Sequence, residues 1–295
     1  MITQHNQRVF FGDNGALQDI TLEVNPYRKG IFPVSYTAGE DYIYCGVDLP
    51  FNHKYFDMTV ANTVVNTVLV EIWDGTEWCE AIDILDDTAN STTNPDASLG
   101  ESGIISFKNR IDNSQGKSVC NWQCDDTDEI TDLTTGPLIY SKYWIRFSWD
   151  VSFTATINHV GQLFNDDDDL YGFYPDLNNQ DMKDCFEPDE PTGTKADWIE
   201  QEIQAVESIT REMRARHLLW SPNQILDFEI LRNAAIHKTA ELIYSAFGTA
   251  YEENRKLAQT KYKEAFNLDK FNIDKNRNSN LDCGEDRVST QYLRR

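Results

Sequence analysis

Alternating apolar and polar positions predict short β-strands throughout residues 1–160. The clearest run, residues 64–73, is rich in β-branched side chains and ends at Asp74-Gly75, a dipeptide favoured in tight hairpin turns. We therefore predict a tight turn there, with residues 77–85 as the returning strand. Further strands are predicted at residues 42–47, 56–60, 103–107, 143–149 and 153–160. Many short strands without a helical period between them predict an antiparallel β-sandwich or jelly roll.

The apolar period changes to that of a helix at Thr194. Thr194-Lys195-Ala196-Asp197 resembles a capping box, and the residues after it form one apolar helical face. The members of that face are Ile199, Ile203, Val206, Ile209 and Met213. Ser221-Pro222 predicts the start of a second helix that ends at Gly248, and a third helix is predicted over residues 250–266. The predicted fold class is α+β, with the β-sandwich followed by a small helical bundle and an extended tail.

The two regions are separated by an acidic stretch, residues 161–193. Ten acids and one base lie between Asp166 and Glu190, and three prolines interrupt the stretch. Self-repulsion and proline favour an extended linker without a core of its own. Residues 166–169, four consecutive Asp, are interpreted as a solvated charge run rather than a metal site. The predicted organisation is residues 1–160, a β-sandwich domain; residues 161–193, the linker; and residues 194–295, a helical domain with a C-terminal tail.

Three helices in about 75 residues make only a small core by themselves. We therefore expect the helices to pack against other copies of the chain or against partner chains.

The formal net charge of −23 is unevenly distributed. Residues 251–295 hold ten bases and eight acids, so residues 1–250 carry sixteen bases and forty-one acids, a net −25. A surface this acidic repels phosphate, which argues against specific nucleic-acid binding. No run approaches the ~18 apolar residues of a membrane span, so no membrane partner is expected. The six cysteines are scattered without a zinc pattern and are interpreted as reduced thiols of a protein made in a cytoplasm.

One loop has the spacing of metal ligands. Residues 274–285 place oxygen donors as an EF-hand calcium loop does, and the candidate ligands are Asp274, Asn276, Asn278, Asn280, Asp282 and Glu285. Ser279 stands where the EF-hand pattern has Gly, Lys275 and Arg277 lie among the ligands, and no amphipathic helix follows. Two interpretations stay open, a possible calcium site and a polar turn before the tail. No other cofactor is indicated.

The sequence contains no phosphate-binding glycine loop, no GxSxG and no HExxH, and its five histidines lie far apart. We therefore expect that the protein is not an enzyme. The aromatic residues are interpreted mainly as core, with sugar stacking by exposed Trp side chains as the alternative.

The helical part resembles the head–tail connector (adaptor) proteins of tailed bacteriophages. The resemblance rests on the order of residues 225–231, the Ala/His/Tyr run 234–247, the charged helix through 251–255, the Asp/Asn loop and the tail 287–295. It implies a homo-dodecameric ring under the portal protein, a channel through which DNA passes without specific binding, and a downstream tail or neck protein as partner. The implied location is the virion neck, after synthesis in the host cytoplasm. The implied portal-docking residues are Arg287, Tyr292, Leu293, Arg294 and Arg295.

The N-terminal part resembles β-sandwich domains of phage virion proteins, through residues 70–78, 99–107 and 143–148. An alternative function follows: a tail or baseplate component whose sandwich binds carbohydrate or the host surface.

Overall fold

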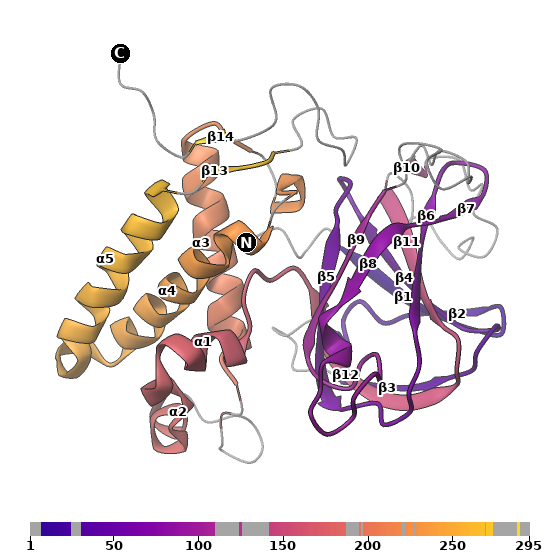
Figure 1. Cartoon of the computed structure of the whole chain (residues 1–295), viewed down its shortest axis with the longest axis horizontal. Coiled ribbons are helices and arrows are strands. Elements are labelled where there is room, and N and C mark those ends of the chain that lie inside the picture. Colours follow the sequence, from indigo (N-terminus) through magenta and orange to yellow (C-terminus); the bar gives the residue numbers. More distant parts are fainter. Residues whose placement is uncertain are drawn as a thin grey trace. The chain divides into compact units, whose positions relative to one another are not determined.

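The computed structural model describes residues 7–24, 31–109, 124–125, 142–186, 195, 197–219, 222–226, 228–268, 270–273 and 288–289. The chain divides into two compact units, with the boundary between Gln162 and Leu163. The first unit contains two antiparallel β-sheets and the second contains the helices (Figure 1). The predicted α+β fold class is therefore confirmed.

The larger sheet has seven strands in the order β2-β1-β4-β11-β6-β7, with β10 paired to β11. Their bounds are β1 (Arg8–Asp13), β2 (Ala16–Asp19), β4 (Tyr42–Val47), β6 (Val68–Trp73), β7 (Trp78–Glu80), β10 (Cys124–Asp125) and β11 (Lys142–Trp149). Strand β11 lies between β4 and β6, so that Ile145 is opposite both Cys45 and Ile72.

The smaller sheet has five strands in the order β3-β12-β5-β9-β8. Their bounds are β3 (Phe32–Tyr36), β5 (His53–Val60), β8 (Ile82–Asp86), β9 (Gly103–Lys108) and β12 (Phe153–Gly161). The pairing of β12 with β5 is irregular between Thr156 and His159, which indicates a β-bulge.

The two sheets share one hydrophobic core. Alternate residues of the larger sheet, such as Val70 and Ile72, belong to the same buried cluster as Phe56 and Ile157 of the smaller sheet. Since side chains alternate between the faces of a strand, one face of each sheet packs on the other. The strand periods read from the sequence therefore identify the core-facing positions.

The turn after β6 differs from the tight turn that Asp74-Gly75 predicts. Strands β6 and β7 pair as far as Trp73 and Trp78, which leaves a four-residue loop. Only Gly75 has a positive φ, 99°. The Asp74 carboxylate accepts hydrogen bonds from the backbone N–H groups of Thr76 and Glu77, both at 2.8 Å, and these bonds stabilise the longer loop.

The single returning strand predicted over residues 77–85 is also wrong. Strand β7 pairs in the larger sheet, whereas β8 pairs with β9 in the smaller sheet. The chain changes sheets at Ala81, whose N–H still donates to the Val70 carbonyl (2.8 Å). Asp83 then has φ 50° and the register shifts between Ile82 and Leu85, so a local kink redirects the strand.

The second unit contains five α-helices. They are α1 (Asp167–Phe173), α2 (Gln180–Phe186), α3 (Ile199–Ala215), α4 (Phe228–Ala246) and α5 (Glu252–Leu268). Short 3₁₀ segments occupy Pro175–Asn178, Pro222–Gln224 and Gly248–Tyr251. All five residues of the apolar face predicted for α3 are buried, which confirms that face.

Two helix starts differ from the sequence prediction. Helix α3 begins after Trp198, and Asp197 accepts from the Ile199 N–H (3.2 Å), so the capping box starting at Thr194 is wrong. Helix α4 begins at Phe228, because Pro222–Gln224 forms a separate 3₁₀ turn and Ile225 makes an isolated bridge to Ile273. The predicted end is right, since α4 stops at Ala246 and Gly248 has φ 64°.

The acidic stretch is helical over much of its length, so the prediction of an extended linker without a core is wrong. Six of its apolar side chains are buried: Leu163, Phe164, Leu170, Tyr174, Leu177 and Met182. The last four form one cluster with Trp198 and with Ile236, Ile243 and Tyr244 of α4. This burial offsets the repulsion between the acids. The long helices therefore pack against buried side chains of their own chain. The expectation that other copies or partner chains are needed to complete their core no longer follows.

The four consecutive Asp are not a solvated charge run. Asp166 caps α1 by accepting from the Asp169 N–H (2.9 Å), and Asp167 accepts from the Trp198 N–H (3.1 Å) and the Tyr171 hydroxyl (2.7 Å). Asp169 pairs with Arg232 of α4 at 2.5 Å. Burial raises the pKa of both Asp166 and Asp167 to about 6. Only Asp168 is exposed, so the acids mainly fix α1 to its surroundings.

A short two-stranded sheet closes the described part of the second unit. Strand β13 (Lys270–Phe271) pairs with β14 (Val288–Ser289), directly after α5. The segment following β13 is attached again by the Leu226 N–H, which donates to the Asn272 carbonyl (3.1 Å). Residues 270–273 and 288–289 therefore both belong to the helical unit.

Candidate functional site

The outer face of the larger sheet carries an aromatic layer. Residues 43, 45, 70, 72, 145 and 147 belong to the sandwich core, so their strand neighbours point to the opposite face. Three of these neighbours, Tyr44, Trp73 and Trp144, form a buried cluster with Phe10 of β1, and Leu17, Tyr42 and Trp78 are partly buried against it. Gly46 makes room for the layer: a Cβ there would lie 2.7 Å from the Trp144 ring.

Arg146 of β11 holds two of these rings in place. Its guanidinium carbon lies 4.2 Å from the centroid of the Tyr42 ring and 4.7 Å from a ring centroid of Trp78. Its Nε donates to Glu71 at 2.6 Å, and both charged side chains are largely buried. Cation–π contact and a charge-assisted hydrogen bond thus fix the orientation of Tyr42.

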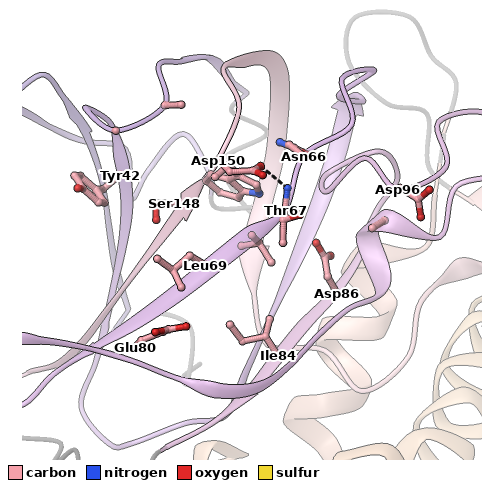
Figure 2. A pocket seen from close by; sticks show the side chains of 15 residues that line it. Tyr42, Asn66, Thr67, Leu69, Glu80, Ile84, Asp86, Asp96, Ser148 and Asp150 are labelled. Atoms are coloured by element: carbon pink, nitrogen blue, oxygen red, sulfur yellow. Dashed lines mark hydrogen bonds between the residues drawn. The ribbon is translucent and has the colours of Figure 1, made fainter. Parts of the chain in front are cut away.

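Tyr42 borders a cleft of about 1060 Å³ in the sandwich unit. Figure 2 shows the side chains that line it, which come from both sheets and the loops between them. Tyr42, Leu69, Glu80 and Ser148 come from the larger sheet, and Ile84 and Asp86 from β8. Asn66, Thr67, Asp96 and Asp150 come from loops. The cleft therefore combines an apolar floor with several polar groups, the composition common in ligand sites.

All charged side chains among the described residues that line the cleft are acidic. Four carboxylates line it: Glu80, Asp86, Asp96 and Asp150. No Lys, Arg or His is among the described residues that line it. Burial raises the pKa of Asp86, although hydrogen bonds from Ser98 and Thr88 act in the opposite direction. Asp150 accepts from the Thr67 N–H at 2.7 Å (Figure 2), and Asp96 is exposed. The cleft therefore disfavours anionic ligands.

Asn66 lies in the lining of the cleft with an incomplete set of hydrogen bonds. Its side chain is 5% exposed, and its Oδ1 accepts from Asn62 Nδ2 at 3.1 Å. Its own Nδ2 is buried without an acceptor in the described part of the chain. Leaving a buried donor unpaired costs about 1–3 kcal/mol, so such a group commonly marks a place where a ligand or water completes the bond.

The loops beneath the cleft are tied together. Asn62 Nδ2 also donates to the carbonyls of Val64 (2.8 Å) and Ser98 (2.9 Å), and the Asn66 N–H donates to the Asp96 carbonyl (3.3 Å). The Leu99 N–H donates to the Thr88 hydroxyl at 2.7 Å. These bonds hold residues 62–66 against residues 96–99 without any ligand.

The site residues singled out from the sequence are not tested by this structure. The candidate calcium ligands Asp274, Asn276, Asn278, Asn280, Asp282 and Glu285 lie outside the described residues. The same holds for the predicted docking residues Arg287, Tyr292, Leu293, Arg294 and Arg295. Both sets therefore stay predictions.

Two of the described histidines, His159 in the sandwich and His237 in the helical unit, make contacts typical of a structural role. His237 is hydrogen-bonded through Nδ1 to the Tyr174 hydroxyl (2.9 Å), and its ring meets the rings of Phe173 and Tyr174 edge-on. Burial, with a smaller contribution from Lys261, lowers the pKa of His237 to about 4. His159 is buried against the Val24 carbonyl. These contacts indicate a structural role for His237.

Sequence reasoning missed the cleft. Its residues come from five strands and four loops, and none of them forms a motif with its neighbours in sequence. One signal was available: the polar stretch 86–99 is longer than most connections in compact domains, and long loops often carry function.

In comparisons with known proteins, no protein-family model, curated sequence or solved structure matches this chain. Among the described residues, the helices are all too short or too polar to cross a membrane. Function is therefore inferred from the fold, the charge and the cleft.

Proposed function

We propose that the chain is a structural protein of a tailed-phage virion, a head-to-tail adaptor that forms a ring under the portal. The observation that supports it best is the form of the helical unit. Three long helices, α3 to α5, are followed by β13 and β14, and the pairing of Lys270–Phe271 with Val288–Ser289 fixes the point from which the chain end departs. A short basic tail that starts from a fixed point suits docking into a partner ring.

The charge of the chain fits this role. A ring of subunits with a net charge of −23 each would repel DNA phosphates, so that DNA would pass its channel without adhering. The terminal Arg294 and Arg295 add positive charge at the end that would meet the portal. Charges of this kind guide docking more than they set affinity.

Ring contacts in this proposal lie between folded subunits, because the helical unit has its own core. Apolar side chains remain exposed on three of its helices: Phe173 on α1, Ile230 on α4 and Leu257 on α5. These are candidates for contact with neighbouring copies, with portal or with a downstream neck protein.

The test is the mass and symmetry of the purified full chain, alone and mixed with portal rings, by mass photometry and electron microscopy. A twelve-fold ring on the portal is expected. Arg294→Ala/Arg295→Ala should weaken portal binding, most clearly at low salt, while Arg211→Ala/Lys263→Ala, which removes two exposed charges from helices, should not. A monomer that ignores portal rings would overturn the adaptor proposal.

A second candidate is a tail or baseplate component whose sandwich binds carbohydrate or the host surface. The observation that favours it is the preformed cleft of about 1060 Å³ with Tyr42 at its border. On the outer sheet face, however, Tyr42 and Trp78 are partly buried rather than fully exposed, and the other Trp and Tyr side chains of the aromatic layer are buried. Binding to a glycan array without any ring in electron micrographs would favour this candidate over the adaptor.

Calcium binding by residues 274–285 is proposed as an addition to either function. Calorimetric titration of calcium into the wild type should give heat with a stoichiometry of one per chain, and Asp274→Ala should abolish it. Asp269→Ala, just before β13, removes an equal charge outside the ligand spacing and serves as the control. A wild type that gives no heat ends the calcium proposal.

A further inference from the structure

We propose that the cleft bordered by Tyr42 is a binding site for an uncharged oligosaccharide, with Asn66 and the carboxylates around it as the hydrogen-bonding groups. This inference rests on the second candidate function and assigns it a site and a ligand class. It is also compatible with the adaptor, because the cleft lies wholly within the sandwich unit.

The hydrogen-bonding requirements of the cleft select the ligand. Asn66 Nδ2 needs an acceptor, whereas the carboxylate oxygens of Asp96 and Asp150 accept hydrogen bonds. A hydroxyl supplies both, so neighbouring hydroxyls of one sugar ring satisfy both requirements. A lysine ammonium only donates, which would leave Asn66 unpaired. A phosphate, sulfate or carboxylate would meet four acids and no base among the described lining residues.

The apolar part of the cleft suits the C–H faces of sugar rings. Leu69 and Ile84 lie in the lining, half-buried, and Tyr42 presents an aromatic ring whose orientation Arg146 fixes. Figure 2 shows Leu69 and Ile84 between the labelled acids, so that apolar and hydrogen-bonding groups alternate along the cleft. Such mixed surfaces bind amphipathic ligands, of which sugars are an example.

The size of the cleft indicates more than one sugar unit. Its volume of about 1060 Å³ lies at the upper end of the roughly 300–1,000 Å³ typical of small-molecule sites. The hydrogen bonds from Asn62 Nδ2 to the Ser98 carbonyl and from the Leu99 N–H to the Thr88 hydroxyl hold the loops in place before any ligand arrives, which reduces the entropy lost on binding. A short oligosaccharide is therefore a better fit than a monosaccharide.

The test uses the full chain on an array of uncharged oligosaccharides of two to six units, followed by titration of the best ligand. Asn66→Ala should weaken binding by about tenfold or more, because it removes the donor that the ligand completes. Asp96→Ala should weaken binding about fivefold to tenfold. Asp83→Ala is the matched control, since Asp83 is also exposed with a positive φ but does not line the cleft, and it should leave affinity unchanged.

The remaining outcomes separate a wrong assignment of the site from a failure of the carbohydrate-binding function itself. If oligosaccharides bind but Asn66→Ala and Asp96→Ala bind equally well, the site assignment is wrong and carbohydrate binding by the protein stands. If Asn66→Ala is misfolded by circular dichroism, Asp96→Ala against Asp83→Ala decides alone. If no oligosaccharide binds, both the inference and the second candidate fail. If only an oligolysine peptide, added as a second probe, binds, the cleft recognises cations and the saccharide proposal is overturned.

Discussion

The cleft of the sandwich and the acidic run 166–169 of the helical unit use their polar residues in different ways. In the sandwich, alternation keeps most polar side chains outside the core, and the unpaired Nδ2 of Asn66 occurs where the chain forms a cleft. In the helical unit, three acids of the run 166–169 are bound internally, to a helix N-terminus, to the Trp198 N–H and to Arg232. The comparison teaches that acid content does not distinguish a linker from a core: the four carboxylates of the cleft line a surface, whereas three acids of the run 166–169 attach a helix to its surroundings.

The comparison is tested most strongly at Leu170. Its side chain is fully buried in the cluster that joins α1 to α4. Leu170→Ala should lower the free energy of unfolding of the helical unit by about 2–5 kcal/mol, through lost burial and a cavity. Hydrogen exchange measured by mass spectrometry on the full chain should show faster exchange in α4, with the strands of the sandwich unchanged.

The matched control is Phe173→Ala in the same helix. Phe173 is 51% exposed and makes one edge-on contact with His237. Its removal should cost less than about 1 kcal/mol. Equal, small effects of the two variants would restore the interpretation of residues 161–193 as a linker without a core.

The strands and long helices were predictable because one physical requirement repeats along them. Two packed sheets need an apolar side chain at every second position, and residues 42–47 are predicted and observed as a strand with the same bounds. Helix α3 needs an apolar stripe every three or four residues, and all five predicted members are buried. Because the requirement repeats at several positions, the pattern can be recognised even where a single residue departs from it.

The acidic segment and the cleft were not predictable for the converse reason. The segment has few apolar residues, and acids separate the ones that pack on α4, which are Leu170, Tyr174, Leu177 and Met182. Without knowledge of those contacts, the acidic composition predicts a linker. The cleft depends on which strands become neighbours, and the exchange of sheets between β7 and β8 at Ala81 gives no signal in the local pattern. Both depend on contacts between residues far apart in sequence.

Two glycines give a smaller effect with opposite signs in the two units. Gly46→Ala places a Cβ 2.7 Å from the fully buried Trp144 ring and should destabilise the sandwich by about 1–3 kcal/mol. Gly172→Ala, in α1, meets no atom within 4 Å and should stabilise the helical unit by about 0.5–1 kcal/mol. Thermal unfolding of the full chain, followed by calorimetry, measures both. A loss of stability in Gly172→Ala would contradict the open space around position 172 of α1.

A further expected effect concerns pH and the buried acids of α1. Burial raises the pKa of Asp166 to about 6, from 3.8, with Asp169 adding to the shift. Because the pKa is higher in the folded state, that state binds the proton more tightly, so the ionised carboxyl destabilises the helical unit above pH 6. This destabilisation is relieved as the pH falls from 7 towards 5, and stability should therefore rise over that range.

Asp166→Asn separates this effect from general acid sensitivity. Asn is an equally good N-cap, so the bond to the Asp169 N–H is kept while the buried charge is lost. The variant should be more stable by about 1–2 kcal/mol at pH 7, and its stability should change less between pH 7 and 5. Asp168→Asn removes the same charge from an exposed position on the same turn and should follow the wild-type pH profile closely. If Asp166→Asn is instead less stable at pH 7, the ionised carboxylate contributes to holding α1, and the helical unit depends on its acids even more than the contacts of Asp169 with Arg232 indicate.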